Sequence, residues 1–168
     1  FENGTILIKN FYYPEDFRIK DGPKKIIETR LLIKEKDDWK ALNYVWRDDQ
    51  KDAELNYIGK KLNISWTHKD GIKKSTVYNV PNNNQCKNCH INGKDISPIG
   101  PTAAQLNRKY NMLSNQINQL EFYDKKGLLK NLPDHDNLPK FAVWDNEKSG
   151  SVEAVSYTHL TLPTKCSV

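Results

Sequence analysis

The stretch that most constrains this chain is QCKNCH, residues Gln85–His90, in which two cysteines lie three positions apart and a histidine follows directly. The chain has 3 Cys and 4 His in 168 residues. With that composition, chance produces the pattern Cys-x-x-Cys-His on the order of once in a thousand chains. The stretch also marks a change of character, because strand-like patterns precede Pro81 and helix-like and loop-like patterns follow it.

The residues before Pro81 predict antiparallel β-structure. Leu62, Ile64 and Trp66 alternate with polar residues, which is the period of a strand with one buried face. A second alternating segment follows Asp70-Gly71, so we expect a hairpin of residues 62–67 and 75–80. Three further apolar segments also predict strands: residues 5–8, 26–34 and 39–46. Short strands at a spacing of roughly ten residues predict an antiparallel β-sandwich or a small barrel over residues 1–80.

Residues 81–154 predict a small helical region, which makes the expected fold class α+β. The asparagines at residues 82–84 are typical of a turn and a helix cap. Thr102 is placed to cap a short helix over residues 103–109. Ser114 is placed to cap a second helix over residues 115–126, which Gly127 would end. The apolar face of this second helix would consist of Leu113, Ile117, Leu120 and Tyr123.

The charge pattern indicates a solvated surface. The formal net charge is +5, but Lys and Arg are interspersed with Asp and Glu, for example over residues 34–38. This mixture favours no nucleic-acid partner. The longest apolar runs are far shorter than a membrane span, so we expect no transmembrane segment. The chain begins at Phe1 without a signal-peptide pattern, and we expect any such signal to lie upstream of this fragment.

The last residues predict a segment that is not native protein. Val155–Thr164, VSYTHLTLPT, matches the translation of a sequencing-library adaptor, and the alternative is a strand rich in Thr and Leu. We therefore leave residues 155–168 out of the reasoning on fold and function. This removes His159 and Cys166 from consideration, and Cys86 and Cys89 remain as the native cysteines.

Three non-haem interpretations of Cys86, Cys89 and His90 meet specific difficulties. A zinc site needs four ligands, and the other histidines, His68 and His135, are distant in sequence. Zinc binding would therefore require both of them or help from carboxylates. A thioredoxin-like dithiol belongs to a βαβ pattern, whereas the strands here are predicted to be antiparallel. A disulfide across two intervening residues closes a strained small loop.

The pattern Cys-x-x-Cys-His is typical of c-type haem attachment. Two cysteines about one helical turn apart can reach the two vinyl groups of one porphyrin as thioethers. The adjacent histidine can then bind the iron as the proximal ligand. The motif therefore predicts Cys86 and Cys89 as the thioether residues and His90 as the axial ligand. We weigh this prediction above the zinc and dithiol alternatives.

The second axial ligand is open at this point. Met112 is the only methionine, and a thioether ligand would raise the reduction potential of a haem. Its surroundings are equally typical of a packed core position. His135 lies in a polar loop, and His68 has the sequence context of a hairpin turn. The ligand can also be absent, or lie in sequence beyond this fragment.

Several segments, in order, resemble bacterial diheme c-type cytochromes in which a β-rich N-terminal region precedes the first haem site. The matching segments are Gly4–Pro14, Ile26–Lys34, Trp39–Trp46, Tyr78–His90, Ser97–Asn107, Ile117–Leu120 and Gly127–Pro133. The resemblance implies a periplasmic or otherwise exported protein with two haems. One haem would bind in this fragment through Cys86, Cys89 and His90. The second would bind in a missing C-terminal part.

These observations predict an electron carrier in the bacterial cell envelope that exchanges electrons with redox partner proteins. We assign no catalytic acid, base or nucleophile. Two other classes remain open. One is a haem enzyme of the peroxidase or oxidase type, in which an open iron position does chemistry. The other is a non-haem module, in which the β-region binds a ligand and Cys86 and Cys89 hold zinc.

Overall fold

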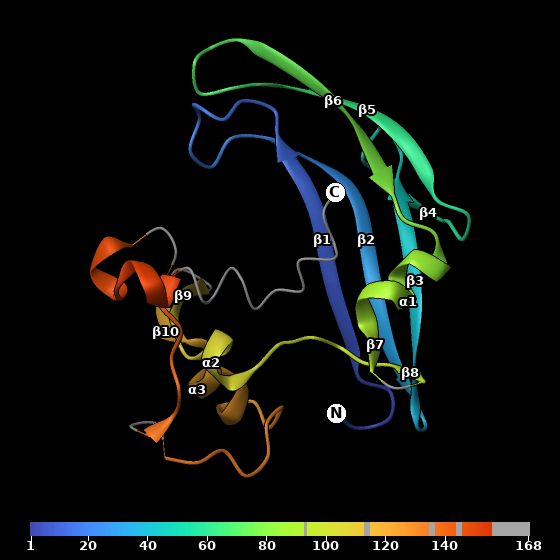
Figure 1. The fold of residues 1–168 in the computed structure, drawn as a ribbon. Coiled ribbons are helices and arrows are strands. Elements are labelled where there is room, and N and C mark those ends of the chain that lie inside the picture. Colours follow the sequence, from blue (N-terminus) through green and yellow to red (C-terminus); the bar gives the residue numbers. More distant parts are fainter. Residues whose placement is uncertain (93, 113–114, 135–136, 144–145, 156–168) are drawn as a thin grey trace. The chain divides into compact units, whose positions relative to one another are not determined.

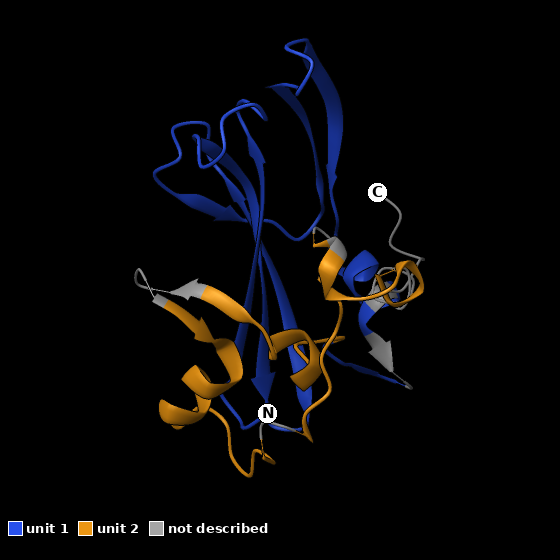
Figure 2. Ribbon diagram, turned by 90° about the vertical axis from the view of Figure 1, so that its left-hand side faces the viewer, with its two compact units in different colours: residues 1–98, 168 blue, residues 99–167 orange. Residues whose placement is uncertain are grey.

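The computed structural model describes residues 1–92, 94–112, 115–134, 137–143 and 146–155. Of these, the side chains of a few residues are not described: Cys89, Ile91, Asn92, Asn111, Met112, Asn115 and Glu147. The chain forms two compact units, one over residues 1–98 and one that begins at Ile99 (Figure 2).

The first unit contains a four-stranded antiparallel sheet in the order β1-β2-β3-β4 (Figure 1). The strands are β1 (Ile6–Pro14), β2 (Lys24–Glu35), β3 (Asp38–Trp46) and β4 (Ala53–Leu55). The three longer strands confirm the predicted strands at residues 5–8, 26–34 and 39–46. The sheet ends in β1 on one side and β4 on the other, so among the described residues it does not close into a barrel.

A hairpin of β5 (Lys60–Thr67) and β6 (Lys73–Val80) confirms the predicted pairing around Asp70-Gly71. Its inward side chains complete the main core of the unit. The buried members of this core come from both the sheet and the hairpin: Ile27, Val45, Ile64, Tyr78 and Val80. Trp66 packs against them, as its place in the alternating pattern predicts. Antiparallel β-structure therefore dominates this part of the chain.

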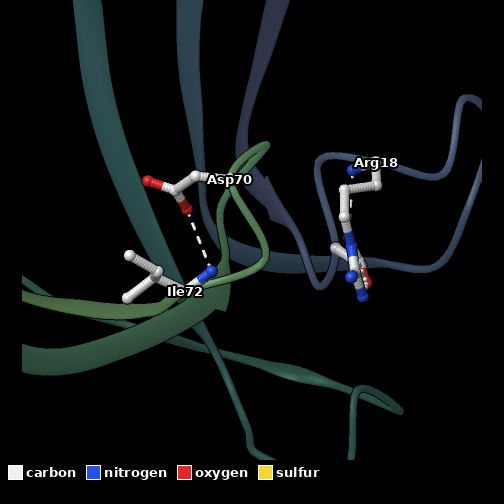
Figure 3. A network of polar contacts seen from close by, with 4 residues as sticks. Arg18, Asp70 and Ile72 are labelled. Carbon is white, nitrogen blue, oxygen red and sulfur yellow. Dashed lines mark hydrogen bonds and ion pairs between the residues drawn. The ribbon is translucent and has the colours of Figure 1, made fainter.

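The loop after β1 is joined to the tip of the β5–β6 hairpin. Phe17 N–H donates to the Thr67 carbonyl at 2.9 Å, and Thr67 N–H donates to the Glu15 carbonyl at 2.9 Å. At the turn itself, Ile72 N–H donates to Asp70 Oδ1 at 2.9 Å, and Arg18 lies close by (Figure 3). His68 lies in this turn, as its sequence context predicts, and its ring is 6.0 Å from that of Phe17.

The second unit contains short elements: α2 (Ala103–Leu106), β9 (Lys109–Met112), β10 (Asn115–Asn118), α3 (Gln119–Lys125) and η2 (Glu147–Ser149). Thr102 caps α2 as predicted, in a capping box with Gln105. The helix predicted over residues 103–109 is shorter than expected, because it ends at Leu106 and Lys109 begins β9. The predicted helix over residues 115–126 is wrong in its first turn. Asn115–Asn118 pairs with β9, and the helix begins only after Asn118, whose side chain accepts from Leu120 N–H.

The end of α3 and its buried side agree with the sequence pattern. Leu120 is 1% exposed, and Gly127 follows the helix with a φ of 69°. Such a positive φ favours glycine. Of the other predicted members of the apolar face, Tyr123 shares α3 with Leu120 and is half-buried, whereas Ile117 belongs to β10. Leu113 and the predicted cap Ser114 lie outside the described residues. The predicted extended helical region is thus not observed in the described part of the second unit.

None of the helices in the described part of the chain is long and apolar enough to cross a membrane. This agrees with the prediction from hydropathy. The adaptor-like segment from residue 156 onward lies outside the described residues, together with His159 and Cys166.

Candidate functional site

The motif Cys-x-x-Cys-His lies on α1 (Asn83–His90), an eight-residue helix in the first unit. The helix begins with a reciprocal cap. Gln85 N–H donates to Asn82 Oδ1 at 2.9 Å, and Asn82 N–H donates to Gln85 Oε1 at 2.9 Å. This arrangement satisfies two backbone donors that the helix itself leaves unpaired. The asparagine stretch before the cysteines therefore acts as a cap, as predicted.

Residues far away in sequence hold the corner between β6 and α1. Asn43 of β3 is 1% exposed, and its Nδ2 donates to the Pro81 carbonyl at 3.3 Å. Asn83 N–H donates to the Tyr57 carbonyl at 3.2 Å. Gly59 has a φ of 82°, and a Cβ at that position would lie 2.8 Å from the Val80 carbonyl oxygen. The corner therefore requires glycine at residue 59, and it sets the direction in which α1 leaves the hairpin.

One face of α1 packs against the rest of the unit. Asn83, Cys86 and His90 are half-buried, whereas the residues between them are exposed: Asn84, Gln85, Lys87 and Asn88. The backbone of Cys89 belongs to the helix, and its side chain is outside the described set. With 3.6 residues per turn, Cys86, Cys89 and His90 occupy one side of the helix. The predicted thioether residues and axial ligand are thus grouped by the helix itself.

Burial shapes the chemistry of Cys86. Its thiol is free, and burial raises its pKa above the ordinary value of 9.0. The positive charge of Arg30 lowers this pKa and the negative charge of Glu28 raises it, and both effects are smaller than that of burial. The thiol is therefore neutral near pH 7. A reactive dithiol instead requires a lowered thiol pKa, so this environment disfavours the thioredoxin-like interpretation.

His90 is oriented by the backbone of Ser97. Its Nδ1 lies 3.3 Å from the Ser97 carbonyl oxygen, and Ser97 N–H donates back to the His90 carbonyl at 2.5 Å. A carbonyl oxygen only accepts, so the neutral imidazole carries its proton on Nδ1. Nε2 then keeps its lone pair. Metal-binding histidines commonly donate their second ring nitrogen in this way, which fixes the ring and increases its basicity.

A buried polar cluster lies on the sheet face beside α1. The Glu28 side chain is 0% exposed, and its Oε1 accepts from the Tyr78 hydroxyl at 2.5 Å and from Arg30 Nη2. Burial raises the pKa of Tyr78, and its bond to Glu28 raises it further. Glu28 follows Ile27, which is the additional residue of a β-bulge between β1 and β2. The bulge lets two consecutive residues of β2 be buried.

A cavity of about 310 Å³ lies on the other side of α1. Trp39 from β3 and Asn83 and Lys87 from the helix contribute to its lining. On the helix, Lys87 and Cys89 lie on opposite sides of His90. Cys86 is not among the residues that line this cavity, and Arg30 and Glu28 act on its thiol.

The residue types on α1 are those that c-type haem attachment uses. Two thiols one turn apart and an imidazole with a free Nε2 are the groups that haem attachment needs. Within the described side chains, no group of three or more His, Cys, Asp or Glu could hold a metal ion. Met112 lies on β9 in the second unit, and its side chain is not described, while His135 lies outside the described residues. Both remain predictions as distal ligands.

No protein-family model, curated protein or solved structure matches this chain. The resemblance to diheme c-type cytochromes therefore remains a prediction from its sequence segments.

Three residues near the motif were not predicted as part of the site: Ser97, Glu28 and Arg30. Glu28 and Arg30 lie between two apolar pieces of the strand segment IIETRLLIK. Their charges within a strand were the signal that could have indicated a buried polar cluster, because buried charges require partners. Ser97 offered no signal, since its contribution comes from the backbone.

Proposed function

We propose that this chain binds one c-type haem through Cys86 and Cys89, with His90 as an axial ligand, and transfers electrons in the bacterial cell envelope. The observation that carries this proposal is the His90 ring. It lies next to the Cys-x-x-Cys pair on a capped helix, and its Nδ1–H points to the Ser97 carbonyl. This geometry leaves Nε2 available for iron.

Each residue of the site has a defined part in this proposal. The cap formed by Asn82 and Gln85 holds the helix that sets the spacing of the two thiols. The free, half-buried thiol of Cys86 would, together with Cys89, hold the porphyrin through thioether bonds. His90 supplies the nitrogen ligand. When bound, the haem iron supplies one-electron redox chemistry.

Finer aspects of the proposal come from the sequence alone. We propose a cytochrome-c-like haem region over residues 81–154, with Met112 as a candidate distal ligand. We also propose a second haem in a further part of the protein, a periplasmic or otherwise exported location, and redox proteins as partners. The segment resemblance supports these points.

The experiment is expression of residues 1–154 with an export signal in a host that matures c-type cytochromes, followed by denaturation, mass measurement and a reduced absorption spectrum. We expect one haem that survives denaturation and is lost in Cys86→Ser/Cys89→Ser. The matched control is Ser97→Ala, which keeps the backbone carbonyl and should keep the haem. A haem-free product from a host that matures a control cytochrome would overturn the proposal.

The same preparation separates the other two classes. A five-coordinate, high-spin spectrum with turnover of peroxide would support a haem enzyme, whereas a six-coordinate, low-spin spectrum supports an electron carrier. Metal analysis that finds zinc without iron would move the assignment to a non-haem module.

A further inference from the structure

The outer edge of β1 has no hydrogen-bonding partner in the described part of the chain. β1 is an outermost strand of its sheet and pairs only with β2 (Figure 1). Two bonds flank this pairing: Lys34 N–H donates to the Thr5 carbonyl at 2.8 Å, and Glu15 N–H donates to the Pro23 carbonyl at 3.0 Å. Because backbone groups alternate in direction along a strand, the odd-numbered residues of β1 bond to β2. The N–H and C=O groups of its even-numbered residues therefore point away from β2.

The same even-numbered residues carry exposed apolar side chains. Ile6 is 51% exposed, Ile8 66% and Tyr12 49%. Side chains two residues apart lie on the same face of a strand, so these three form one row along the edge. Their neighbours on β2, Ile33 and Leu31, are half-buried and extend the apolar surface. A long edge strand with unpaired backbone groups and apolar side chains is a template for pairing with another strand.

Lys9 is the charged residue of β1, and a charge on an edge strand commonly opposes pairing. Its Nζ lies over the ring of Phe11 on the same strand, 4.8 Å from the centroid. If β1 pairs antiparallel along its whole length with β1 of a second copy, Lys9 faces Phe11 of that copy, and a cation attracts an aromatic ring. A shift by two residues would instead bring the two Lys9 side chains opposite each other, which is destabilising. Lys9 therefore selects the full-length register.

We propose that β1 pairs antiparallel with β1 of a second copy of this chain, about a twofold axis at Asn10, and so forms a symmetric dimer with a continuous sheet. In this register Asn10 faces Asn10, and Ile8 faces Tyr12 of the second copy. The outward N–H and C=O groups of these residues bond across the axis. Pro14 lacks an N–H, but it lies at the end of the pairing, where it faces Ile6. A twofold axis is the commonest symmetry of protein dimers. The dimer does not depend on the haem assignment.

The first experiment measures the mass of the full chain by sedimentation equilibrium, in a reducing buffer that prevents disulfide-linked dimers. We expect the mass to rise from one copy to two as the concentration increases from about 1 to 200 µM. Asn10→Lys brings like charges together at the axis and should raise the dissociation constant about fivefold, and Asn10→Asp should act alike. An equimolar mixture of these variants should restore association, because opposite charges then face each other. Asn79→Lys, at an exposed position of β6, is the matched control and should change nothing.

The second experiment locates the interface by hydrogen exchange. The amides of Ile8 and Tyr12 should be protected only at concentrations at which the dimer forms, whereas those of Leu7 and Phe11 bond to β2 and should be protected throughout. A chain that stays monomeric over the whole range would overturn the proposal, as would a dimer in which Ile8 and Tyr12 exchange freely. Protection of these two amides in the monomer would show that another part of the same chain covers the edge, which also overturns it. Undiminished association of Asn10→Lys would overturn the register.

Discussion

Two arginine–carboxylate pairs in the first unit share the same sequence spacing and differ in their surroundings. Asp16 and Arg18 lie in the loop after β1, where Arg18 Nη2 is 2.6 Å from Asp16 Oδ2; the arginine side chain is 54% exposed and the aspartate side chain 18%. Glu28 and Arg30 lie on β2, where the carboxylate is 0% exposed and also binds the Tyr78 hydroxyl. One pair is at the surface, and the other is packed between the sheet and the hairpin.

The two pairs differ in contact geometry, since Asp16 accepts from both Nε and Nη2 of Arg18 and Glu28 only from Nη2 of Arg30, and they differ in burial. We expect burial to have the larger effect on what each pair does for the protein. Solvent screens an exposed ion pair, so its effect on stability is small. A buried pair costs desolvation when it forms, and the loss of one partner leaves an uncompensated charge. The buried pair also acts on the Cys86 thiol, whereas the exposed pair secures a loop next to the hairpin turn (Figure 3).

The largest expected effect comes from breaking the buried pair. Glu28→Ala leaves the Arg30 charge and the Tyr78 hydroxyl without their acceptor, and we expect a loss of about 3–5 kcal/mol in the free energy of unfolding. Urea unfolding followed by tryptophan fluorescence measures it. Asp16→Ala is the matched control and should change stability far less. Equal losses at the two positions would contradict the role given to burial.

A smaller effect should follow from removing one donor to Glu28. Tyr78→Phe keeps the ring in the core and deletes the hydroxyl, so we expect a loss of about 1–3 kcal/mol. Urea unfolding of Tyr78→Phe, Glu28→Ala and the double variant completes a thermodynamic cycle. Because the two groups share one hydrogen bond, the double variant should lose less than the sum of the single losses. Strict additivity would show that the bond contributes nothing.

A variant of the helix cap tests whether α1 is stabilised by its own capping residues or by packing against the rest of the first unit. Asn82→Ala removes the side-chain acceptor for Gln85 N–H, and we expect a loss of about 1 kcal/mol. Hydrogen exchange of the Cys86 amide, which donates to the Asn82 carbonyl at 3.2 Å, should quicken while the β2 amides keep their protection. Asn84→Ala, at an exposed helix position, is the control. An unchanged exchange rate of the Cys86 amide would show that packing alone, and not the cap, stabilises α1.

The smallest effect concerns the exposed pair and pH. The side-chain bond from Arg18, followed by its backbone N–H, lowers the pKa of Asp16 from 3.8 to about 2. A lowered pKa in the folded state stabilises the fold above the ordinary pKa, and this contribution is lost as pH falls from about 4 through about 2. An NMR titration of the Asp16 carboxyl measures the value. Arg18→Gln should move it back toward 3.8, and an unchanged value would contradict the assignment to Arg18.

Alternation and β-branched content predicted the longer strands of this chain, because a strand with one buried face repeats every two residues. The hairpin of β5 and β6 is an example, with Leu62, Ile64 and Trp66 on its inner side. The three-residue β4 has no such repeat, since it is too short to show a period. Its place in the sheet comes from pairing with β3.

The wrong first turn of the predicted helix has a physical explanation. Asn115–Asn118 has no helical apolar face of its own, and its backbone finds partners in β9. Asn118 then caps the helix through Leu120 N–H, in place of Ser114. Pairing between neighbouring segments here replaces the local helical pattern that Leu113 and Ile117 indicated.

The sequence by itself determined the donor set of the site. Cys86, Cys89 and His90 share one side of a helix because of their spacing, and Asn82 and Gln85 start that helix, since capping and helical periodicity act over a few residues. Only the tertiary structure decided what surrounds these groups. Asn43 and Gly59 direct the helix, Ser97 orients His90, and Glu28 and Arg30 set the charge beside Cys86. Burial and electrostatic effects depend on segments that are distant in sequence, so they arise only when the strands pack together.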